Sequence, residues 1–128
     1  MEKASRTILI VDDEYDILNS LEMVFTAEGF SVRTAHDGKE ALEQLAKVPL
    51  PDLILSDIMM PIMDGYALVK AVKEVPSFRK IPIILISAAL LDDSKCKKKD
   101  YTHFIRKPFD LDRLILVVRQ SFLNEKIP

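Results

Sequence analysis

The sequence predicts an open α/β domain in which helices cover both faces of a five-stranded parallel sheet. Short apolar runs rich in branched residues recur five times, and segments with the spacing of an amphipathic helix separate them. Parallel neighbours need crossover connections, and helices supply these while burying the faces of the sheet. A chain of 128 residues suits one such domain, so we expect a single unit over residues 1–128, with its core at about residues 6–123 and a short tail.

The five apolar runs are the expected strands. They lie at Ile8 to Val11, Ser31 to Ala35, Leu53 to Ser56, Ile83 to Ser87 and His103 to Arg106. Runs of this length are typical of buried strands and are too short for most helices. Their distribution along the chain leaves room for one helix after each strand.

Four of the segments beside these runs carry clear apolar stripes and are expected to be helices. The stripes are Ile17, Leu18, Leu21, Val24 and Phe25; then Ala41, Leu42 and Leu45; then Ala67, Leu68, Ala71 and Val72; and last Leu111, Leu114, Ile115, Val118 and Phe122. Gly29 follows the first stripe, where glycine ends many helices, and Asp64 is placed to cap the third helix.

The segment from Leu90 to Asp100 is the exception to this pattern. Two aspartates and a serine are followed by four lysines between Lys95 and Lys99, so a helix here would have little apolar surface to bury. We therefore expect the fourth helix to be short, frayed or displaced. The lysines are typical of a solvated face, with a docking patch for an acidic partner as the other interpretation, and Cys96 among them is expected to be an inert surface thiol.

Composition excludes several classes of function. The formal net charge of -2 gives no basic field for nucleic acid. No apolar stretch reaches the roughly 18 residues that a membrane span needs. The first residues lack a signal-peptide pattern, and a single cysteine cannot form an internal disulfide. We therefore expect a cytoplasmic domain that binds neither nucleic acid nor membrane.

Carboxylates follow two of the expected strands at the point where each strand ends. Asp12 and Asp13 follow the first strand, and Asp57 follows the third, just before the turn-forming segment Met59 to Gly65. Ligands of open parallel sheets lie outside the carboxyl ends of the strands, so these acids meet if the first and third strands are neighbours. Three converging carboxylates need a cation, and oxygen ligands without any Cys/His spacing predict Mg²⁺ rather than zinc.

Polar residues also end the last two strands. Ser87 closes the fourth run with a hydroxyl, and Lys107 follows the fifth with an ammonium group. Carboxylates, a metal, a hydroxyl and a lysine together suit phosphoryl chemistry. Each residue alone has a plainer interpretation: Asp12 and Asp13 as helix caps, Asp57 as a turn residue, Ser87 and Lys107 as surface groups. Their joint placement favours a site.

These motifs resemble the receiver domain of two-component response regulators. The matching motifs are Asp12-Asp13, Asp57 with Met60-Pro61-Ile62-Met63-Asp64-Gly65, Ser87-Ala88 and Lys107-Pro108-Phe109. They occur in order over nearly the whole chain, and four motifs at strand ends are far more specific than one acidic pair. The resemblance implies a flavodoxin-like doubly wound (βα)5 domain with strand order 2-1-3-4-5.

The resemblance also implies roles for the acidic residues. Asp57 would be the phosphoacceptor, receiving a phosphoryl group from a histidine of a partner kinase. Asp13, Asp57 and the backbone carbonyl of Met59 would bind Mg²⁺ directly, and Asp12 would hold a metal-bound water. Lys107 would pair with a phosphoryl oxygen. The domain's contribution would be positioning and electrostatics.

A switch is implied at Ser87 and Phe104. Ser87 would move to hydrogen-bond a phosphoryl oxygen, and Phe104 would rotate into the vacated room, repacking the surface around the fourth helix and fifth strand. Considered by itself, Phe104 is better interpreted as core packing. The small residue Ala88 would leave the phosphoryl group accessible.

The implied activity is regulatory rather than enzymatic, because the domain would catalyse only its own phosphorylation and slow dephosphorylation. The expected upstream partner is a sensor histidine kinase or a histidine phosphotransfer protein. Downstream we expect a protein target or a fused output domain, and a phosphorylation-dependent homodimer is a further option.

The sequence departs from the family near the fourth helix. Asp100-Tyr101 stands where the family often has Gly-Ala, and the interval from Ser87 to Lys107 is a residue or two shorter than usual. A phosphorylation-independent interaction module of the same fold is therefore the alternative function. A haloacid-dehalogenase-like phosphatase would need an aspartate at the position of Glu14, and a flavin mononucleotide-binding flavodoxin would need a hydroxyl- and glycine-rich loop in place of the acidic residues.

Overall fold

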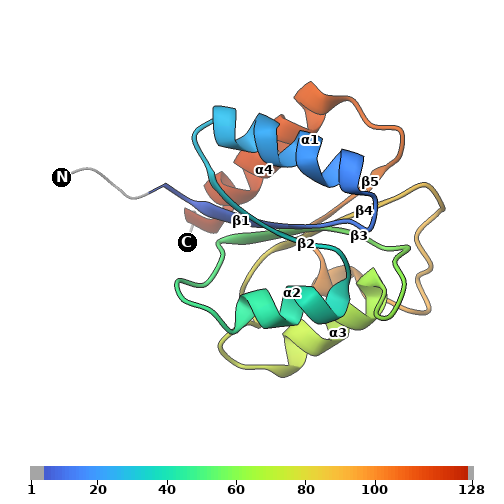
Figure 1. Cartoon of the computed structure of the whole chain (residues 1–128). Helices are drawn as coiled ribbons and strands as arrows, with labels where there is room; N and C mark the ends of the chain where they lie inside the picture. The colour runs from blue at the N-terminus through green and yellow to red at the C-terminus, as the bar shows by residue number, and fades with distance from the viewer. Residues whose placement is uncertain (1–4, 127–128) are drawn as a thin grey trace.

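Five parallel strands form one sheet in the order β2-β1-β3-β4-β5 in the computed structural model, which describes residues 5–126 (Figure 1). The strands are β1 (Thr7–Val11), β2 (Ser31–Ala35), β3 (Leu53–Asp57), β4 (Ile83–Ser87) and β5 (His103–Arg106). All five predicted strands and their order are confirmed. β1 begins one residue earlier than expected, and β3 includes Asp57 because this residue still pairs with Ile86 of β4.

Helices form a layer on each face of the sheet. The helices are α1 (Tyr15–Ala27), α2 (Gly38–Leu45), α3 (Gly65–Glu74) and α4 (Leu111–Lys126). Figure 1 shows α1 and α4 on one face and α2 and α3 on the other. Within the described residues, no helix is long and apolar enough to span a bilayer.

The two faces of the central strands supply separate halves of the core. Ile8 and Ile10 of β1 belong to the cluster under α1 and α4, whereas Leu9 and Val11 belong to the cluster under α2 and α3. This alternation follows from the two-residue period of a strand. Strands buried on both faces show continuous apolar runs, which is why the sequence revealed them so clearly.

Local signals set the ends of several helices. Gly29, just past α1, has a φ of +98°, a conformation that glycine adopts without strain. Asp37 Oδ1 accepts a hydrogen bond from the Glu40 amide at 2.8 Å at the start of α2. Asp64 Oδ1 accepts one from the Ala67 amide at 2.9 Å at the start of α3, so the predicted cap is confirmed.

Two of the predicted apolar stripes need correction. On α3, Ala67 of the predicted stripe is exposed, whereas Val69, which the stripe did not include, is buried beside Leu68 and Val72. The larger side chain gains more from burial than alanine does. On α4 the first residue, Leu111, stays exposed, since the helix buries its side chains only from Leu114 onward. The helix also continues beyond residue 123, where the expected core ended, to residue 126.

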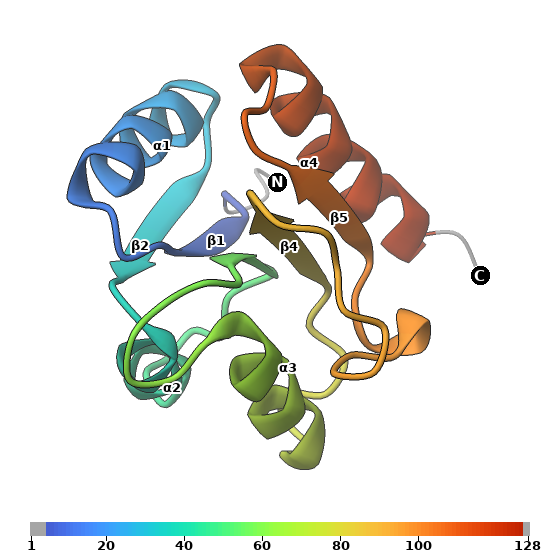
Figure 2. The same ribbon diagram turned by 90° about the vertical axis from the view of Figure 1, so that its right-hand side faces the viewer.

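The connection between β4 and β5 contains no α-helix. Its only helical element is a single 3-10 turn, Lys98–Asp100, which confirms the expectation of a short or irregular fourth helix. Figure 2 shows this connection as a loop beside α3. Leu91, Cys96 and Tyr101 pack against the core here, whereas the lysines are exposed. So few apolar contacts do not support a helix of ordinary length.

Candidate functional site

The carboxyl ends of four strands bring the predicted site residues to one edge of the sheet. Asp12 directly follows β1, Asp57 and Ser87 are the last residues of β3 and β4, and Lys107 directly follows β5. The Lys107 amide donates to the Ser87 carbonyl at 2.9 Å, which extends the pairing of β4 and β5 beyond the strands. β1 and β3 are neighbours, and strand order reverses between them, so the site lies where doubly wound sheets bind ligands.

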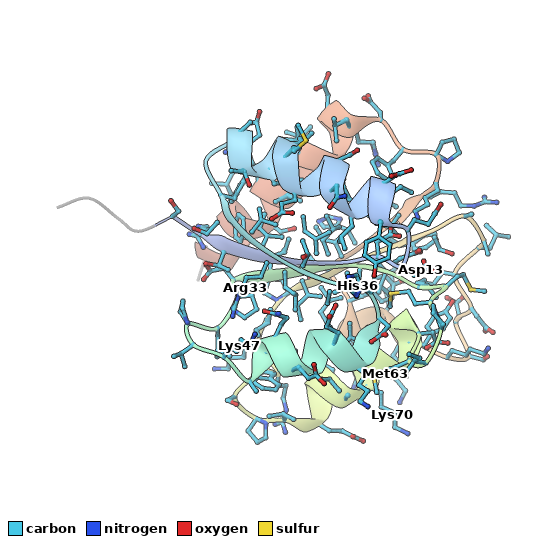
Figure 3. All side chains as sticks on the ribbon, viewed as in Figure 1. Asp13, Arg33, His36, Lys47, Met63 and Lys70 are labelled. Atoms are coloured by element: carbon cyan, nitrogen blue, oxygen red, sulfur yellow. The ribbon has the colours of Figure 1, made fainter. Side chains whose placement is uncertain are left out.

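Three carboxylates converge at this edge. One oxygen each from Asp12, Asp13 and Asp57 lies within 4.8 Å of the others. Asp12 and Asp57 are buried, with 3% and 6% exposure, while Asp13 is more accessible and lies at the same end of the sheet as His36 (Figure 3). A cluster made only of oxygen donors fits a hard divalent cation better than a soft one.

Lys107 is the cation that the structure places among these acids. Its Nζ lies 3.2 Å from Asp12 Oδ2, 3.4 Å from Asp57 Oδ2 and 3.6 Å from Glu14 Oε1. The lysine side chain is 14% exposed, so its contacts with the buried Asp12 and Asp57 form in a largely desolvated setting, whereas Glu14 is exposed. The ammonium group therefore offsets part of the negative charge of the cluster.

Backbone amides orient the two buried carboxylates. The Ile58 amide donates to Asp57 Oδ1 at 2.9 Å, and the Glu14 amide donates to Asp12 Oδ1 at 2.9 Å. The other oxygen of each acid, Oδ2, faces Lys107. Each carboxylate is thus held at two points, which fixes its plane before any ligand arrives.

Burial raises the pKa of both buried acids, and repulsion from Asp12 adds to the rise at Asp57. Burial, followed by the nearby Asp12 charge, raises the pKa of Asp57 to about 6, although Lys107 acts in the opposite direction. Burial also raises the pKa of Asp12. Burial lowers the pKa of Lys107, but the charges of Asp12 and Asp57 outweigh it and the net direction is upward. A cation that offsets such repulsion would be stabilising, so the cluster could hold a metal ion.

Gly65 allows the turn after β3 to fold back on the site. A Cβ atom on Gly65 would lie 2.6 Å from the Asp57 carbonyl oxygen and 2.7 Å from the Ile58 Cα. The Gly65 amide donates to the Ile58 carbonyl at 2.8 Å. Only a residue without a side chain permits this approach, which anchors the start of α3 against the backbone of Asp57.

The same turn is closed around Ile62 and held by α2. The Met63 amide donates to the Pro61 carbonyl at 2.7 Å, and Ile62 between them has a φ of +69°, which is rare for a β-branched residue. The Gly38 amide donates to the Met63 carbonyl at 3.0 Å. The side chain of Met59, whose carbonyl is an expected metal ligand, is exposed in this turn.

Ser87 and Phe104, the residues of the implied switch, face the same side of the sheet. Ser87 lies two residues beyond Leu85, which is in register with Phe104 on β5. Ser87 is buried, and its Oγ accepts a hydrogen bond from the Ala89 amide at 3.1 Å. Phe104 is half-buried and packs against the core under α2 and α3, as the core-packing interpretation expects. Ala88 is exposed.

Some residues near the site were missed or misplaced by sequence reasoning. The contact of Glu14 with Lys107 was not predicted; its only signal was its position directly after the acidic pair. Cys96 is buried, not on the surface, and burial raises the pKa of its thiol. His36 lies outside the acidic cluster, with its Nδ1 3.1 Å from Glu40 Oε1.

The fold and the site together define a class: flavodoxin-like domains with an acidic cluster and a lysine at the point where strand order reverses. The model of the response regulator receiver domain family matches residues 8–119, and the chain belongs to this family. The resemblance found in the motifs is thereby confirmed.

Relatives and solved structures agree with this assignment. The regulatory protein AtoC of Escherichia coli K12 is 39% identical over 124 residues, covering 92% of this chain and 25% of AtoC. The response regulator PleD of Caulobacter vibrioides is 40% identical over 117 residues, covering 90% of this chain and 26% of PleD. This chain therefore spans about a quarter of the length of these two relatives.

Two solved structures show the same fold over nearly the whole chain. The signal receiver domain of a histidine kinase from Syntrophus aciditrophicus is 32% identical, with a TM-score of 0.86 and coverage of 97% of this chain and 95% of that domain. The chemotaxis response regulator CheY4 of Vibrio cholerae is 30% identical, with a TM-score of 0.79 and coverage of 91% and 98%.

Proposed function

We propose that this chain is a phospho-accepting domain of a two-component system, in which Asp57 receives a phosphoryl group from a phosphohistidine of a partner protein. One observation carries the proposal: the buried carboxylate of Asp57 converges with Asp12 and Asp13 and contacts Lys107 at the carboxyl edge of the sheet. Membership of the receiver family supports the same reading.

Asp57 would act as the nucleophile. A carboxylate oxygen attacks the phosphorus atom, the bond between phosphorus and the imidazole nitrogen breaks, and the electron pair returns to the imidazole. The product is an aspartyl phosphate. The hydrogen bond from the Ile58 amide keeps the Asp57 carboxylate oriented, so little reorganisation is needed before attack.

Mg²⁺ would be held by Asp12, Asp13, Asp57 and the backbone carbonyl of Met59, with Asp12 acting through a bound water. The convergence of three carboxylates, two of them buried and with raised pKa values, supports a divalent ion at this place. When bound, the ion supplies positive charge that offsets both the acids and the phosphoryl oxygens.

Lys107 would donate a hydrogen bond to a phosphoryl oxygen. Its Nζ is 3.4 Å from Asp57 Oδ2, so only a small shift would bring it against a group attached to that carboxylate. Its raised pKa keeps the ammonium form at neutral pH. Because phosphoryl transfer spreads negative charge over several oxygens, positioning and charge are what the domain has to supply.

Ser87 and Phe104 would transmit the event. The Ser87 hydroxyl would break its hydrogen bond with the Ala89 amide and donate to a phosphoryl oxygen. Phe104 would then rotate toward the space that the Ser87 side chain vacates. Their position on one face of neighbouring strands supports this coupling. Phosphorylation would then shift the population between two packings that the domain already samples.

The upstream partner would be a sensor histidine kinase or a histidine phosphotransfer protein, and the downstream one a protein target or a fused output domain. AtoC and PleD are about four times longer than the region they share with this chain, which fits a receiver joined to further domains in those proteins. The domain would act in the cytoplasm, catalyse only its own phosphorylation and slow dephosphorylation, and form a homodimer when phosphorylated.

Incubation with acetyl phosphate and Mg²⁺, followed by intact mass measurement, tests the proposal. We expect a gain of one phosphoryl group that disappears in EDTA and in Asp57→Asn. Asp64→Asn is the matched control, because it removes the same charge from a cap outside the acidic cluster and should leave the gain intact. A gain that persists in Asp57→Asn would rule out this residue as the acceptor. Light scattering with and without beryllofluoride measures dimerisation.

A phosphorylation-independent interaction module is the second candidate function. The observation that favours it is the missing helix between β4 and β5, since the implied switch would repack this region. The same mass experiment separates the two functions. A folded protein that gains no phosphoryl group under any condition would support the module and remove the phospho-acceptor.

A further inference from the structure

A cavity of about 470 Å³ lies between α3 and the connection that joins β4 to β5. Tyr66 and Val69 of α3 form part of one wall, and Cys96 of the connection forms part of the other. Val69 and Cys96 are buried and Tyr66 is half-buried, so this part of the lining is apolar and ordered. Pockets for small molecules in proteins are commonly about 300–1,000 Å³.

Basic side chains dominate the remainder of the cavity. Six line it: Lys70, Lys73, Arg79, Lys95, Lys97 and Lys99. Only two acidic side chains, Glu74 and Asp100, line it as well, which leaves an excess of four positive charges. The whole chain has a formal net charge of -2, so the charge of the cavity lining is opposite in sign to that of the molecule. Concentrated charge of one sign in a concave site attracts ligands of the opposite sign.

The basic groups of the cavity are not held in close ion pairs. Among the described residues, none of the six forms an ion pair with a carboxylate within 4.0 Å. Lys70 extends from the side of α3 that faces away from the sheet (Figure 3). Cations that have no carboxylate partner in contact are stabilised when an anion binds among them.

Some of these groups are already held in place around the cavity. Lys73 Nζ donates to the Arg79 carbonyl at 3.0 Å, and Arg79 Nε donates to the Lys73 carbonyl at 3.0 Å. Lys95 Nζ lies 5.8 Å from the centre of the Tyr66 ring. Groups ordered before binding lose less conformational entropy when a ligand arrives.

We propose that this cavity binds a compact polyanion that carries two or more phosphate groups. The lysines and the arginine would contact the phosphates, and the apolar wall at Tyr66 and Val69 would accept any remaining part of the ligand. A concave site of this volume, bounded by a helix and a loop, favours a small ligand over an acidic protein segment. The cavity is distinct from the phosphoryl-accepting site, since neither Asp57 nor Lys107 lines it.

Binding of inorganic triphosphate, pyrophosphate and ADP to the whole chain tests this proposal. EDTA is present throughout, so that no metal–phosphate complex is drawn to the acidic cluster. Calorimetry gives the affinity, and an amide NMR titration gives the location. We expect saturable shifts confined to α3, Arg79 and residues 94–100. Tighter binding of ADP than of pyrophosphate would assign a nucleoside ligand, and equal binding would assign an inorganic one; both support the proposal.

Two double variants with the same change of charge complete the experiment. Lys70→Gln with Lys97→Gln removes two cations from the cavity and should weaken triphosphate binding roughly tenfold. Lys39→Gln with Lys47→Gln removes two exposed lysines elsewhere and should leave binding unchanged. Equal losses in both variants, or shifts spread over all surface lysines, would overturn the proposal. A poly-glutamate peptide that binds the same residues more tightly than triphosphate would also overturn it, in favour of a protein-docking surface.

Discussion

Two connections of this domain leave buried strands at the same edge of the sheet and are held in different ways. The turn after β3 is fixed by backbone hydrogen bonds: the Gly65 amide donates to the Ile58 carbonyl, and the Gly38 amide donates to the Met63 carbonyl. The connection after β4 is held mainly by side chains such as Cys96 and Tyr101, which pack against the core. The first connection carries the proposed chemistry, and the second carries the proposed response.

This difference fits what each connection has to do. Phosphoryl transfer needs carboxylates held at defined positions, and backbone contacts provide this independently of most side chains. A surface that responds to phosphorylation has to suit the particular partner protein of each receiver domain. A connection held by a few side chains can change for this purpose without disturbing the acidic cluster. The irregular segment in this chain therefore does not disturb the geometry of Asp57 and Lys107.

Hydrogen exchange should show the largest contrast between the two connections. The Ile58 and Gly65 amides are bonded within the fold, so their exchange should require nearly global unfolding. The amides of Lys97 to Lys99, in an exposed segment, should open locally and exchange about a thousandfold faster. Residue-resolved exchange by NMR measures this. Similar protection in both segments would show that the connection after β4 is as rigid as the turn.

Gly65→Ala should cause the largest loss of stability. The added Cβ would collide with the backbone of Asp57 and Ile58, which cannot give way as a flexible side chain can. We expect the free energy of unfolding to fall by roughly 2–3 kcal/mol in urea titrations. Ala89→Val, an enlargement at an exposed position in the connection after β4, should change it by less than about 0.5 kcal/mol. Equal effects would contradict the proposed contrast in rigidity.

Lys107→Met should lower the free energy of unfolding somewhat less than Gly65→Ala does. It leaves Asp12 and Asp57 buried without their cation, and we expect a loss of about 2 kcal/mol in EDTA. Added Mg²⁺ should recover part of this loss, because the ion would offset the same charges. Lys97→Met, at an exposed position, is the matched control and should lie within about 0.5 kcal/mol of the parent. No response to Mg²⁺ in the Lys107 variant would argue against a metal in the cluster.

The position of the site could be predicted from the sequence because it depends only on where the strands end. Apolar runs gave the strands, and parallel strands place the residues at their carboxyl ends on one edge. Asp57, Ser87 and Lys107 therefore lie where the pattern put them. The order of the strands came from the resemblance to receiver domains, since periodicity carries no information on which strands are neighbours.

Details that depend on tertiary packing could not be predicted. The burial of Cys96 depends on its packing against the core beside α3, whereas its neighbours in sequence are lysines that suggest a surface. Glu14 reaches Lys107 only because β1 and β5 end at the same edge. The lack of apolar residues between Leu90 and Asp100 predicted a weak helix, but not which side chains would pack in its place.

The thiol of Cys96 tests the packing of the connection after β4, and this test has the smallest expected effect. Burial, and then the charge of Asp100, raise its pKa, while Lys73 acts in the opposite direction. Because only the thiolate is alkylated, the midpoint of the iodoacetamide rate against pH should lie higher in the folded protein than in urea. Asp100→Asn should lower the folded midpoint slightly, and Lys73→Gln should raise it. A folded midpoint below the value in urea would mean that the surrounding lysines outweigh burial, and that the connection after β4 is more open to water than its packing indicates.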